Sequence, residues 1–456
     1  MDPPGPTPTD RAEGDINLSQ QRRQWTDAHV DENTARILAD DARWFLHQSL
    51  STPCLNVLSG CEAIYLIDQQ GRRIMDFHGN SVHQVGHANP RVIEAVKTQL
   101  DRLAFCPRRY TNEPAIELAS KLSQLAPGRL NKVLFAPSGT GAIGIALKLA
   151  RHATRRFKTV SMWDSFHGAS LDAISIGGES LFRKDVGPLL PGTEHVPPPT
   201  PGNCPFGCEG TCTLKCAEYI DYVLTREGDV AAVVAETMRC TTVVPPPPGY
   251  WRAVREICDR HGALLILDEI PIALGRTGHM FCCEHDDIVP DMLVIGKGLG
   301  GGVFPMAAVI AREDLDVAPD RALGHYTHEK SPLGAAAGLA TIRCIEEDGL
   351  LENARRLGSH ALERLGAMQA DHPLIADVRG LGLLLGVELR RDGHKATHEA
   401  EQIMYACLSR GLSFKVSDGN VLTLCPPLTI QQDQLDEALD MVAEAIGQAE
   451  HPAGPT

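Results

Sequence analysis

The stretch Ala263-Leu-Leu-Ile-Leu-Asp-Glu-Ile270 decides the fold of this chain. Its continuous apolar run leads into Asp268, which is the pattern of a strand buried on both faces of a parallel sheet. A second apolar run, Met292-Leu-Val-Ile295, leads into Gly296-Lys297-Gly298, where the glycines let the backbone bend and leave the lysine amine uncrowded. Two strands are therefore predicted to deliver an aspartate and a lysine at their carboxyl ends.

The pattern outside these strands predicts an α/β fold. Short apolar runs alternate with helical stretches from about residue 75 to residue 340, at 132–135, 159–162, 230–234 and 307–310. This alternation is typical of a mostly parallel sheet with helices on both faces, and the strands and helices after residue 341 predict a smaller α+β domain. We expect a mobile N-terminal arm (1–25), an N-terminal part of the small domain (26–75), a large cofactor-binding domain (76–340) and a C-terminal small domain (341–456).

Composition narrows the classes of molecule that this chain can bind. The formal charge of −15 argues against nucleic acid or an anionic membrane, because either would require a basic surface. The chain shows no signal segment and no apolar run long enough to span a membrane, and its fourteen cysteines are typical of a reducing compartment. We therefore expect a cytoplasmic protein with a small-molecule ligand.

Three motifs resemble those of the class III (ω-type) aminotransferase family. They are Asp268-Glu269-Ile270, Leu274-Gly-Arg-Thr-Gly278 and Gly296-Lys-Gly-Leu-Gly300. An aspartate that holds a pyridinium nitrogen and a lysine that forms a Schiff base are the two groups that a pyridoxal phosphate enzyme requires. The resemblance implies pyridoxal 5′-phosphate as cofactor, the fold-type-I architecture of aspartate-aminotransferase-like enzymes, and a homodimer with active sites at the subunit interface.

A small turn, Ser138-Gly139-Thr140, follows the strand at 132–135 and opens a helix. Free N–H groups and the positive end of the helix dipole at such a turn attract an anion, although an ordinary helix cap has the same pattern. The resemblance implies that Ser138, Gly139 and Thr140 hold the cofactor phosphate. It also implies that Thr327 reaches this phosphate from the partner subunit.

Other cofactor contacts are expected at strand ends. Phe166 and His167 follow the strand at 159–162, where an aromatic ring stacks on the pyridine ring in the family, although a core phenylalanine beside a structural histidine fits as well. Asp268 is expected to hold the ring nitrogen, with Ile270 beside it, and Lys297 to form the Schiff base and then act as the base. Glu236 matches a family glutamate near the site, and helix capping or solvation is its alternative role.

The sequence departs from family transaminases at three positions, and these departures make it less suited to ordinary 2-oxoglutarate-coupled transamination. The family position that commonly holds a carboxylate-binding arginine is Thr423, and the position of the glutamate that pairs with that arginine is Thr241. Pro271 replaces a glutamine that usually serves the cofactor. A threonine cannot replace the bidentate grip of an arginine on a carboxylate.

A lyase does not need that grip, because it has no second half-reaction with a keto acid. The sequence offers cations for a substrate dianion: Arg108 and Arg109 beside Tyr110, then Arg239 and Lys415, with Lys330 as a further candidate. Each of them has a solvated surface charge as its alternative role. We expect substrate binding by Arg108, Arg109, Tyr110, Arg239 and Lys415.

The combined pattern resembles the family members that are ammonia-lyases of 1-hydroxy-2-aminoethylphosphonate. In that chemistry Lys297 removes a proton from the carbon that bears nitrogen, the neighbouring hydroxyl leaves, and phosphonoacetaldehyde and ammonia result. The acid that assists the hydroxyl stays open among Lys297, Tyr110 and a phosphonate proton. The alternatives are an ω-aminotransferase with an unusual keto-acid acceptor and a binding protein on the same scaffold.

Four cysteines recur at four-residue spacing, at Cys204, Cys208, Cys212 and Cys216. Four thiolates can hold a tetrahedral zinc, but the usual ligand pairs are two or three residues apart. The alternative is a Pro- and Gly-rich surface loop with free thiols, and no metal is expected in the catalytic site.

Overall fold

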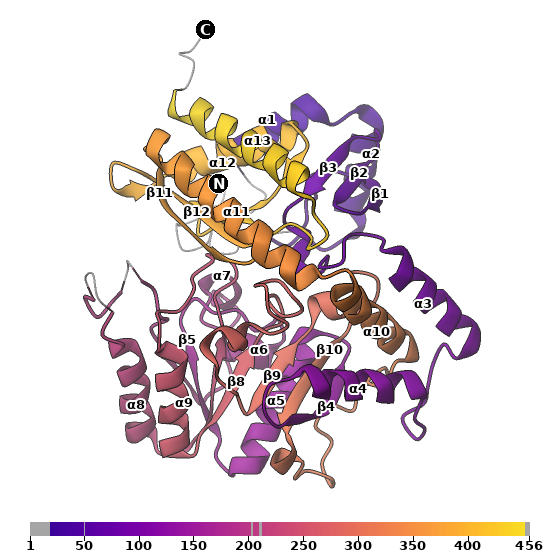
Figure 1. Cartoon of the computed structure of the whole chain (residues 1–456), viewed down its shortest axis with the longest axis vertical. Coiled ribbons are helices and arrows are strands. Elements are labelled where there is room, and N and C mark those ends of the chain that lie inside the picture. The colour runs from indigo at the N-terminus through magenta and orange to yellow at the C-terminus, as the bar shows by residue number, and fades with distance from the viewer. Residues whose placement is uncertain (1–18, 50, 202–203, 209–211, 452–456) are drawn as a thin grey trace.

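The fold is built on three sheets and the helices that cover them (Figure 1). The computed structural model describes residues 19–49, 51–201, 204–208 and 212–451. The N-terminal and C-terminal segments lie together at one end of the molecule, and the middle of the chain forms the other end (Figure 1). No helix in the described ranges is long and apolar enough to cross a membrane.

The largest sheet has seven strands in the order β4-β10-β9-β8-β7-β5-β6. All the pairs from β9 to β6 are parallel, and β10 runs antiparallel to both of its neighbours. The expectation of a mostly parallel sheet is therefore confirmed. The link between β9 and β10 is too short for the crossover that a parallel pair needs, so β10 reverses direction. Its strands are β4 (Leu130–Ala136), β5 (Lys158–Met162), β6 (Thr193–Val196), β7 (Val230–Glu236), β8 (Leu264–Asp268), β9 (Met292–Ile295) and β10 (Ala307–Arg312).

Helices cover both faces of this sheet because its central strands are apolar on both sides. On β8, Ile266 packs in a cluster with helix α5 (Gly139–Thr154), whereas Leu265 and Leu267 pack in the cluster that contains helix α9 (Tyr250–His261). Helix α8 (Lys215–Glu227) lies beside α9 (Figure 1). Successive side chains of a strand point to opposite faces, so this apolar run supplies two cores at once.

The other two sheets join distant parts of the chain. The first orders β1 (Leu58–Glu62), β2 (Tyr65–Asp68), β3 (Arg73–Asp76) and β14 (Leu412–Ser413), so an N-terminal hairpin pairs with a C-terminal strand. The second orders β11 (Ile375–Leu381), β12 (Leu384–Arg391), β16 (Val421–Leu424) and β15 (Lys415–Ser417), with β13 (His394–Lys395) paired to β12. The long helices around them are α11 (Leu350–Asp371), α12 (Thr397–Ser409) and α13 (Gln432–Glu450).

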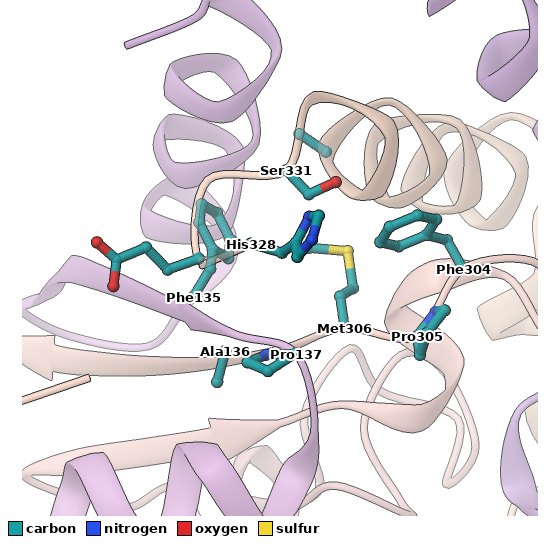
Figure 2. Close-up of a pocket in the computed structure, with 10 residues that line it drawn as sticks. Phe135, Ala136, Pro137, Phe304, Pro305, Met306, His328 and Ser331 are labelled. Carbon is teal, nitrogen blue, oxygen red and sulfur yellow. The ribbon is translucent and has the colours of Figure 1, made fainter. Parts of the chain in front are cut away.

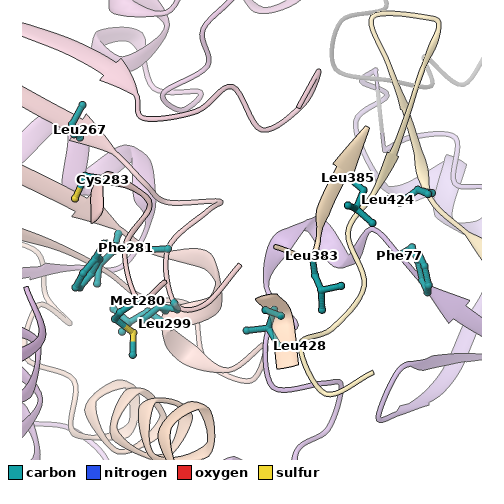
Figure 3. Close-up of a cluster of buried hydrophobic side chains, with 14 of the residues drawn as sticks. Phe77, Leu267, Met280, Phe281, Cys283, Leu299, Leu383, Leu385, Leu424 and Leu428 are labelled. Atoms are coloured by element: carbon teal, nitrogen blue, oxygen red, sulfur yellow. The ribbon is translucent and has the colours of Figure 1, made fainter. Parts of the chain in front are cut away.

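The remaining helices connect these parts. They are α1 (Gln20–His29), α2 (Glu32–Trp44), α3 (Pro90–Arg102), α4 (Glu113–Leu125), α6 (Leu171–Ile176), α7 (Ser180–Arg183), α10 (Pro332–Glu347), and the single-turn helices η2 (Gly79–Ser81), η3 (Cys282–Asp286), η4 (Lys297–Gly300) and η5 (Glu313–Leu315). One hydrophobic cluster runs from the large sheet into the C-terminal sheet, for example from Leu267 and Phe281 to Leu383 and Leu424 (Figure 3). This shared core fixes the two sheets relative to each other.

The prediction of a mobile arm at residues 1–25 is wrong for its last residues, from Ser19 onward. Ser19 caps α1 by accepting the N–H of Arg22, and the guanidinium of Arg22 donates to the carbonyl of Pro53 at 2.8 Å. Trp25 is buried, with its ring centroid 6.3 Å from that of Tyr405 on α12. The mainly polar composition of this segment did not indicate that Trp25 packs helix α1 against the rest of the chain. Residues 1–18 lie outside the described ranges.

Candidate active site

The carboxyl ends of three neighbouring strands converge at one edge of the large sheet. Glu236 ends β7 and Asp268 ends β8, and the two residues are paired in register. Lys297 opens the turn η4 directly after β9, with a left-handed backbone (φ 42°) between two glycines. Ligands of open α/β sheets bind at this edge, and a strained non-glycine residue is typical of a functional site.

Asp268 is held in one orientation by its neighbours. It is 2% exposed, one carboxylate oxygen accepts the N–H of Ile270 at 3.0 Å, and the other lies 2.8 Å from Nδ1 of His167. Nε2 of His167 lies 3.5 Å from the Ser161 hydroxyl. A buried carboxylate that is oriented in this way suits a protonated ring nitrogen, which is the partner that a pyridoxal phosphate ring offers.

The first turn of α5 forms a small cradle. Ser138 caps the helix by accepting the N–H of Gly141 at 3.3 Å, and the Thr140 hydroxyl lies 2.5 Å from that of Ser170. A Cβ on Gly139 would lie 2.7 Å from Ile270, and one on Gly168 would lie 2.5 Å from Thr140. The glycines therefore let Ile270 and Thr140 pack closely at this turn, whose hydroxyls and helix N–H groups fit a phosphate.

Phe166 is half-buried, and its backbone is tied to the end of β7. Its N–H donates to the Glu236 carboxylate at 3.1 Å, and its ring centroid lies 4.3 Å from that of Phe182. Glu236 therefore binds the backbone of Phe166 and is not a helix cap. This link gives the carboxylate a definite role in positioning the aromatic ring.

Arg239 does not face an open anion site. Its guanidinium donates to Glu236 at 2.6 Å and to Glu179 at 2.6 Å, and Glu179 is 2% exposed. Two carboxylates already surround this cation, so a substrate dianion would be repelled here. The prediction that Arg239 binds substrate thus meets a competing structural role, which the sequence spacing did not reveal.

Lys415 lies directly opposite Thr423 in the pairing of β15 with β16. The Thr423 hydroxyl donates to the carbonyl of Thr241 at 2.6 Å and lies 3.0 Å from the hydroxyl of Ser417, so it is engaged within the protein. Lys415 is half-buried. The strand position expected to hold an arginine therefore has a lysine as its cross-strand neighbour.

Arg108, Arg109 and Tyr110 are exposed, and so is Thr327. The loop at 106–112 is bonded to the loop at 325–330: Arg108 donates to the carbonyl of His325 at 2.9 Å, and Asn112 donates to that of Lys330 at 3.0 Å. The two predicted loops thus form one surface unit, here called the paired loops (106–112 and 325–330). The Tyr326 hydroxyl donates to the Gly141 carbonyl at 3.3 Å, which places this unit beside the first turn of α5.

A cavity of about 230 Å³ lies next to the paired loops (Figure 2). Its lining is mainly apolar and includes Phe135, Phe304, Met306 and His328. Neither Asp268 nor Lys297 is part of that lining, but Ala136 and Pro137 place the cavity at the carboxyl end of β4, next to Ser138.

Sequence reasoning missed His78. The N–H of Phe77 donates to the carbonyl of Ser413 at 2.8 Å, and the N–H of Cys425 donates to the carbonyl of Phe77 at 2.8 Å, so His78 leaves β3 between β14 and the end of β16. Burial, with the positive charges of Lys415 and Lys297, lowers the pKa of His78 to about 4. No sequence signal marked it, because its neighbours come from distant segments.

The cysteine motif is not assembled into a metal-binding set. Within the described ranges, no three of the thiols of Cys204, Cys208, Cys212 and Cys216 come together at ligand spacing. Cys216 is buried on α8, Cys212 is exposed, and none of the fourteen cysteines forms a disulfide.

Comparison with known proteins identifies relatives across nearly the whole chain. The family model described as aminotransferase class-III matches residues 49–446. An (R)-1-hydroxy-2-aminoethylphosphonate ammonia-lyase of Vibrio splendidus (strain 12B01) is 48% identical over 96% of this chain and 95% of its own length.

Two further relatives differ in reaction. A leucine/methionine racemase of Thermococcus litoralis is 39% identical over 84% of this chain and 88% of its own length. The crystal structure of a transaminase from the marine bacterium Virgibacillus is 28% identical and superposes with a TM-score of 0.84 over 91% of this chain and 99% of that one. The fold is therefore shared by enzymes that catalyse different reactions.

Proposed function

The chain belongs to the class-III aminotransferase family, and on that premise we propose that it is an ammonia-lyase that converts 1-hydroxy-2-aminoethylphosphonate into phosphonoacetaldehyde and ammonia. Its cofactor is pyridoxal 5′-phosphate. When bound, this cofactor supplies an electron-accepting ring that stabilises the charge left on carbon after proton removal.

The residues at the edge of the large sheet where the carboxyl ends of its strands converge are suited to this cofactor. Asp268, oriented by His167, would hold the ring nitrogen, and the first turn of α5, with Gly139 and Thr140, would hold the phosphate. Lys297 would bind the cofactor aldehyde. Phe166, whose backbone is fixed by Glu236, would stack on the ring.

The observation that carries the choice of reaction is the pairing of Lys415 with Thr423. Transfer to a keto acid calls for a bidentate carboxylate grip, and the Thr423 hydroxyl is already bonded within the protein. Lys415 supplies a point charge that suits a phosphonate and is one strand away. The 48% identity with the Vibrio lyase supports the same assignment.

Lys297 is the residue that moves the proton. Its freed amine removes a proton from the carbon that bears nitrogen, and the adjacent carbon loses its hydroxyl as water. Water later hydrolyses the released enamine's tautomer, so the net loss is ammonia. This route needs no second substrate.

We propose a homodimer in which Thr327 acts on the partner's site. Several large apolar side chains that stay exposed in the single chain support an interface: Trp44 (72%), Phe45 (65%), Leu46 (92%), Phe105 (40%) and Tyr110 (67%). Because hydrogen bonds join the two paired loops, Arg108 and Arg109 would reach the partner's site together with Thr327. A reducing cytoplasm suits the fourteen unpaired thiols.

The second candidate function is an ω-aminotransferase that moves the amino group of a small amine to a keto acid. The shared fold with a solved transaminase favours it. Both functions use the same cofactor contacts, so a reaction must separate them.

The test is incubation of the holoenzyme with racemic 1-hydroxy-2-aminoethylphosphonate, without keto acid, followed by measurement of ammonia and phosphonoacetaldehyde. We expect catalytic turnover that disappears in Lys297→Ala and persists in Lys148→Ala, whose lysine is exposed on α5. Bleaching of the cofactor band with one amine consumed per site, and no free ammonia, would overturn the lyase and support the transaminase.

A further inference from the structure

The neighbours of His78 come from three separate segments of the chain. Asp76 at the end of β3 is paired in register with Ser413 on β14, and the adjoining Phe77 is bonded to both Ser413 and Cys425. Lys415 lies only two residues beyond Ser413. His78 therefore leaves the sheet at the point where Lys415 begins β15.

The turn that follows His78 packs against the turn that carries Lys297. Helix η2 (Gly79–Ser81) contacts η4, and a Cβ on Gly298 would overlap the side-chain amide of Gln84. The Asp76 carboxylate accepts the N–H groups of His78 and Gly79 at 2.9 Å each, which fixes the start of this turn. His78 thus begins a turn that packs against η4, which carries Lys297, and it follows a strand end bonded to Ser413, two residues before Lys415.

The charges of both lysines act on the His78 ring. The charges of Lys415 and Lys297 each lower the pKa of His78, whereas Asp76 and a hydrogen bond with Asn80 raise it. Burial is the largest cause, and the result is a pKa of about 4, so the ring is neutral near pH 7 while no substrate is bound.

The order of groups in the proposed substrate matches this arrangement. Its amine goes to the Lys297 end and its phosphonate to Lys415, so the carbon that carries the hydroxyl lies between them. We propose, on the basis of the proposed elimination, that His78 is the catalytic acid that protonates the departing hydroxyl.

Each bond change has a defined partner. Lys297 takes the proton from the carbon that bears nitrogen, and the electron pair of that C–H bond becomes the new carbon–carbon double bond. The C–O bond breaks with its pair on oxygen, and the oxygen takes a proton from His78 and leaves as water. His78 then regains a proton from solvent.

Substrate itself prepares this acid. The phosphonate dianion offsets the charge of Lys415, so one cause of the low pKa of His78 is removed and the pKa rises when substrate binds. His78 therefore holds a proton more readily when a phosphonate is bound than in the free enzyme.

The test compares two leaving groups. Hydroxide needs an acid and fluoride does not, so we compare 1-hydroxy-2-aminoethylphosphonate with 1-fluoro-2-aminoethylphosphonate in the holoenzyme and in His78→Gln and His78→Asn. We expect loss of hydroxyl elimination by about 10²- to 10⁴-fold, with fluoride release close to that of the wild type. The control His152→Gln, on the far end of α5, is expected to keep both rates.

Two further measurements complement this comparison: the first needs no turnover, and the second needs no variant. Binding of 2-aminoethylphosphonate, which has no leaving group, is expected to draw a proton from solution in the wild type and not in His78→Gln. In the wild type, kcat for the hydroxy substrate is expected to fall at alkaline pH as His78 loses its proton, while kcat for the fluoro substrate does not.

The outcomes separate this proposal from the proposed function. A wild type that releases no ammonia from the hydroxy substrate would remove the lyase itself. A wild type that does so, with variants that keep hydroxyl elimination or lose both leaving groups equally, would overturn the role of His78 alone.

Discussion

At the scale of single residues, Arg239 has two competing roles that a substitution can separate. Its guanidinium joins Glu179 to Glu236, and Glu236 holds the backbone of Phe166. We predict that Arg239→Gln weakens cofactor binding by about 10- to 100-fold, because it leaves two buried carboxylates without their cation and releases Phe166. Titration of the cofactor-free protein with pyridoxal phosphate measures this. A raised KM for substrate with unchanged cofactor affinity would instead restore Arg239 as the anion ligand.

Glu269 gives a pH-dependent prediction. It accepts the N–H groups of Cys282 and Cys283 inside the core, and burial raises its pKa to about 7 from an ordinary value of 4.5. The folded state therefore binds this proton more tightly, so stability is present below pH 4.5 and is lost as pH rises through about 7. We expect wild type to lose on the order of 3 kcal/mol over this window relative to Glu269→Gln.

Urea unfolding at pH 5 and pH 7.5 measures that difference. Glu117→Gln, at an exposed position on α4, is the control and is expected to follow the wild type. Parallel pH dependence in wild type and Glu269→Gln would show that Glu269 is already ionised in the fold at pH 5.

At the scale of elements, helix α11 carries two glycines in opposite surroundings. Gly358 is buried against the backbone carbonyl of Gly382, and an added Cβ would overlap it, whereas Gly366 is exposed and has open space. We predict that Gly358→Ala destabilises the protein by about 1–3 kcal/mol and that Gly366→Ala stabilises it by about 0.5–1 kcal/mol. Thermal unfolding of the two variants checks both signs. A stabilised Gly358→Ala would mean that α11 can move away from Gly382 without penalty.

The same scale shows what the sequence could predict. The two runs that form β8 and β9 were identifiable because a strand buried on both faces is continuous and apolar. The first run ends in Asp268, and the second leads into Lys297. The pairing of Arg239 with Glu179 was not identifiable, because the two residues are sixty positions apart in the sequence. His78 was missed for the same reason, since Lys297 and Lys415 reach it only through the fold. Local pattern therefore predicts which element carries a side chain, but not which distant side chains surround it.

At the scale of the whole molecule, several neighbouring residues on and beside the paired loops stay exposed to solvent in a single chain. Thr327, Arg108 and Arg109 lie on the paired loops, and Phe105 contacts His328 there with ring centroids 5.1 Å apart. Tyr326 reaches back to α5 of the same chain, so the unit is held rigidly while its outer residues face solvent. A rigid surface unit with cations and exposed aromatic rings suits a second copy of the chain better than it suits water.

Mixing two inactive variants tests whether this unit acts on the partner's site. Lys297→Ala removes the base, and Thr327→Glu is predicted to expel the cofactor by placing a carboxylate beside its phosphate. If Thr327 acts across the interface, a mixed dimer contains one site with an intact Lys297 and an intact Thr327, and up to a quarter of wild-type activity returns after denaturation and joint refolding, since half of the dimers are mixed and each has one working site of two. If Thr327 acts within its own chain, every site in the mixture carries one of the two substitutions and no activity returns. Refolding each variant alone, with ammonia release as the measurement, is the control, and sedimentation of the mixture verifies that dimers have formed in either case.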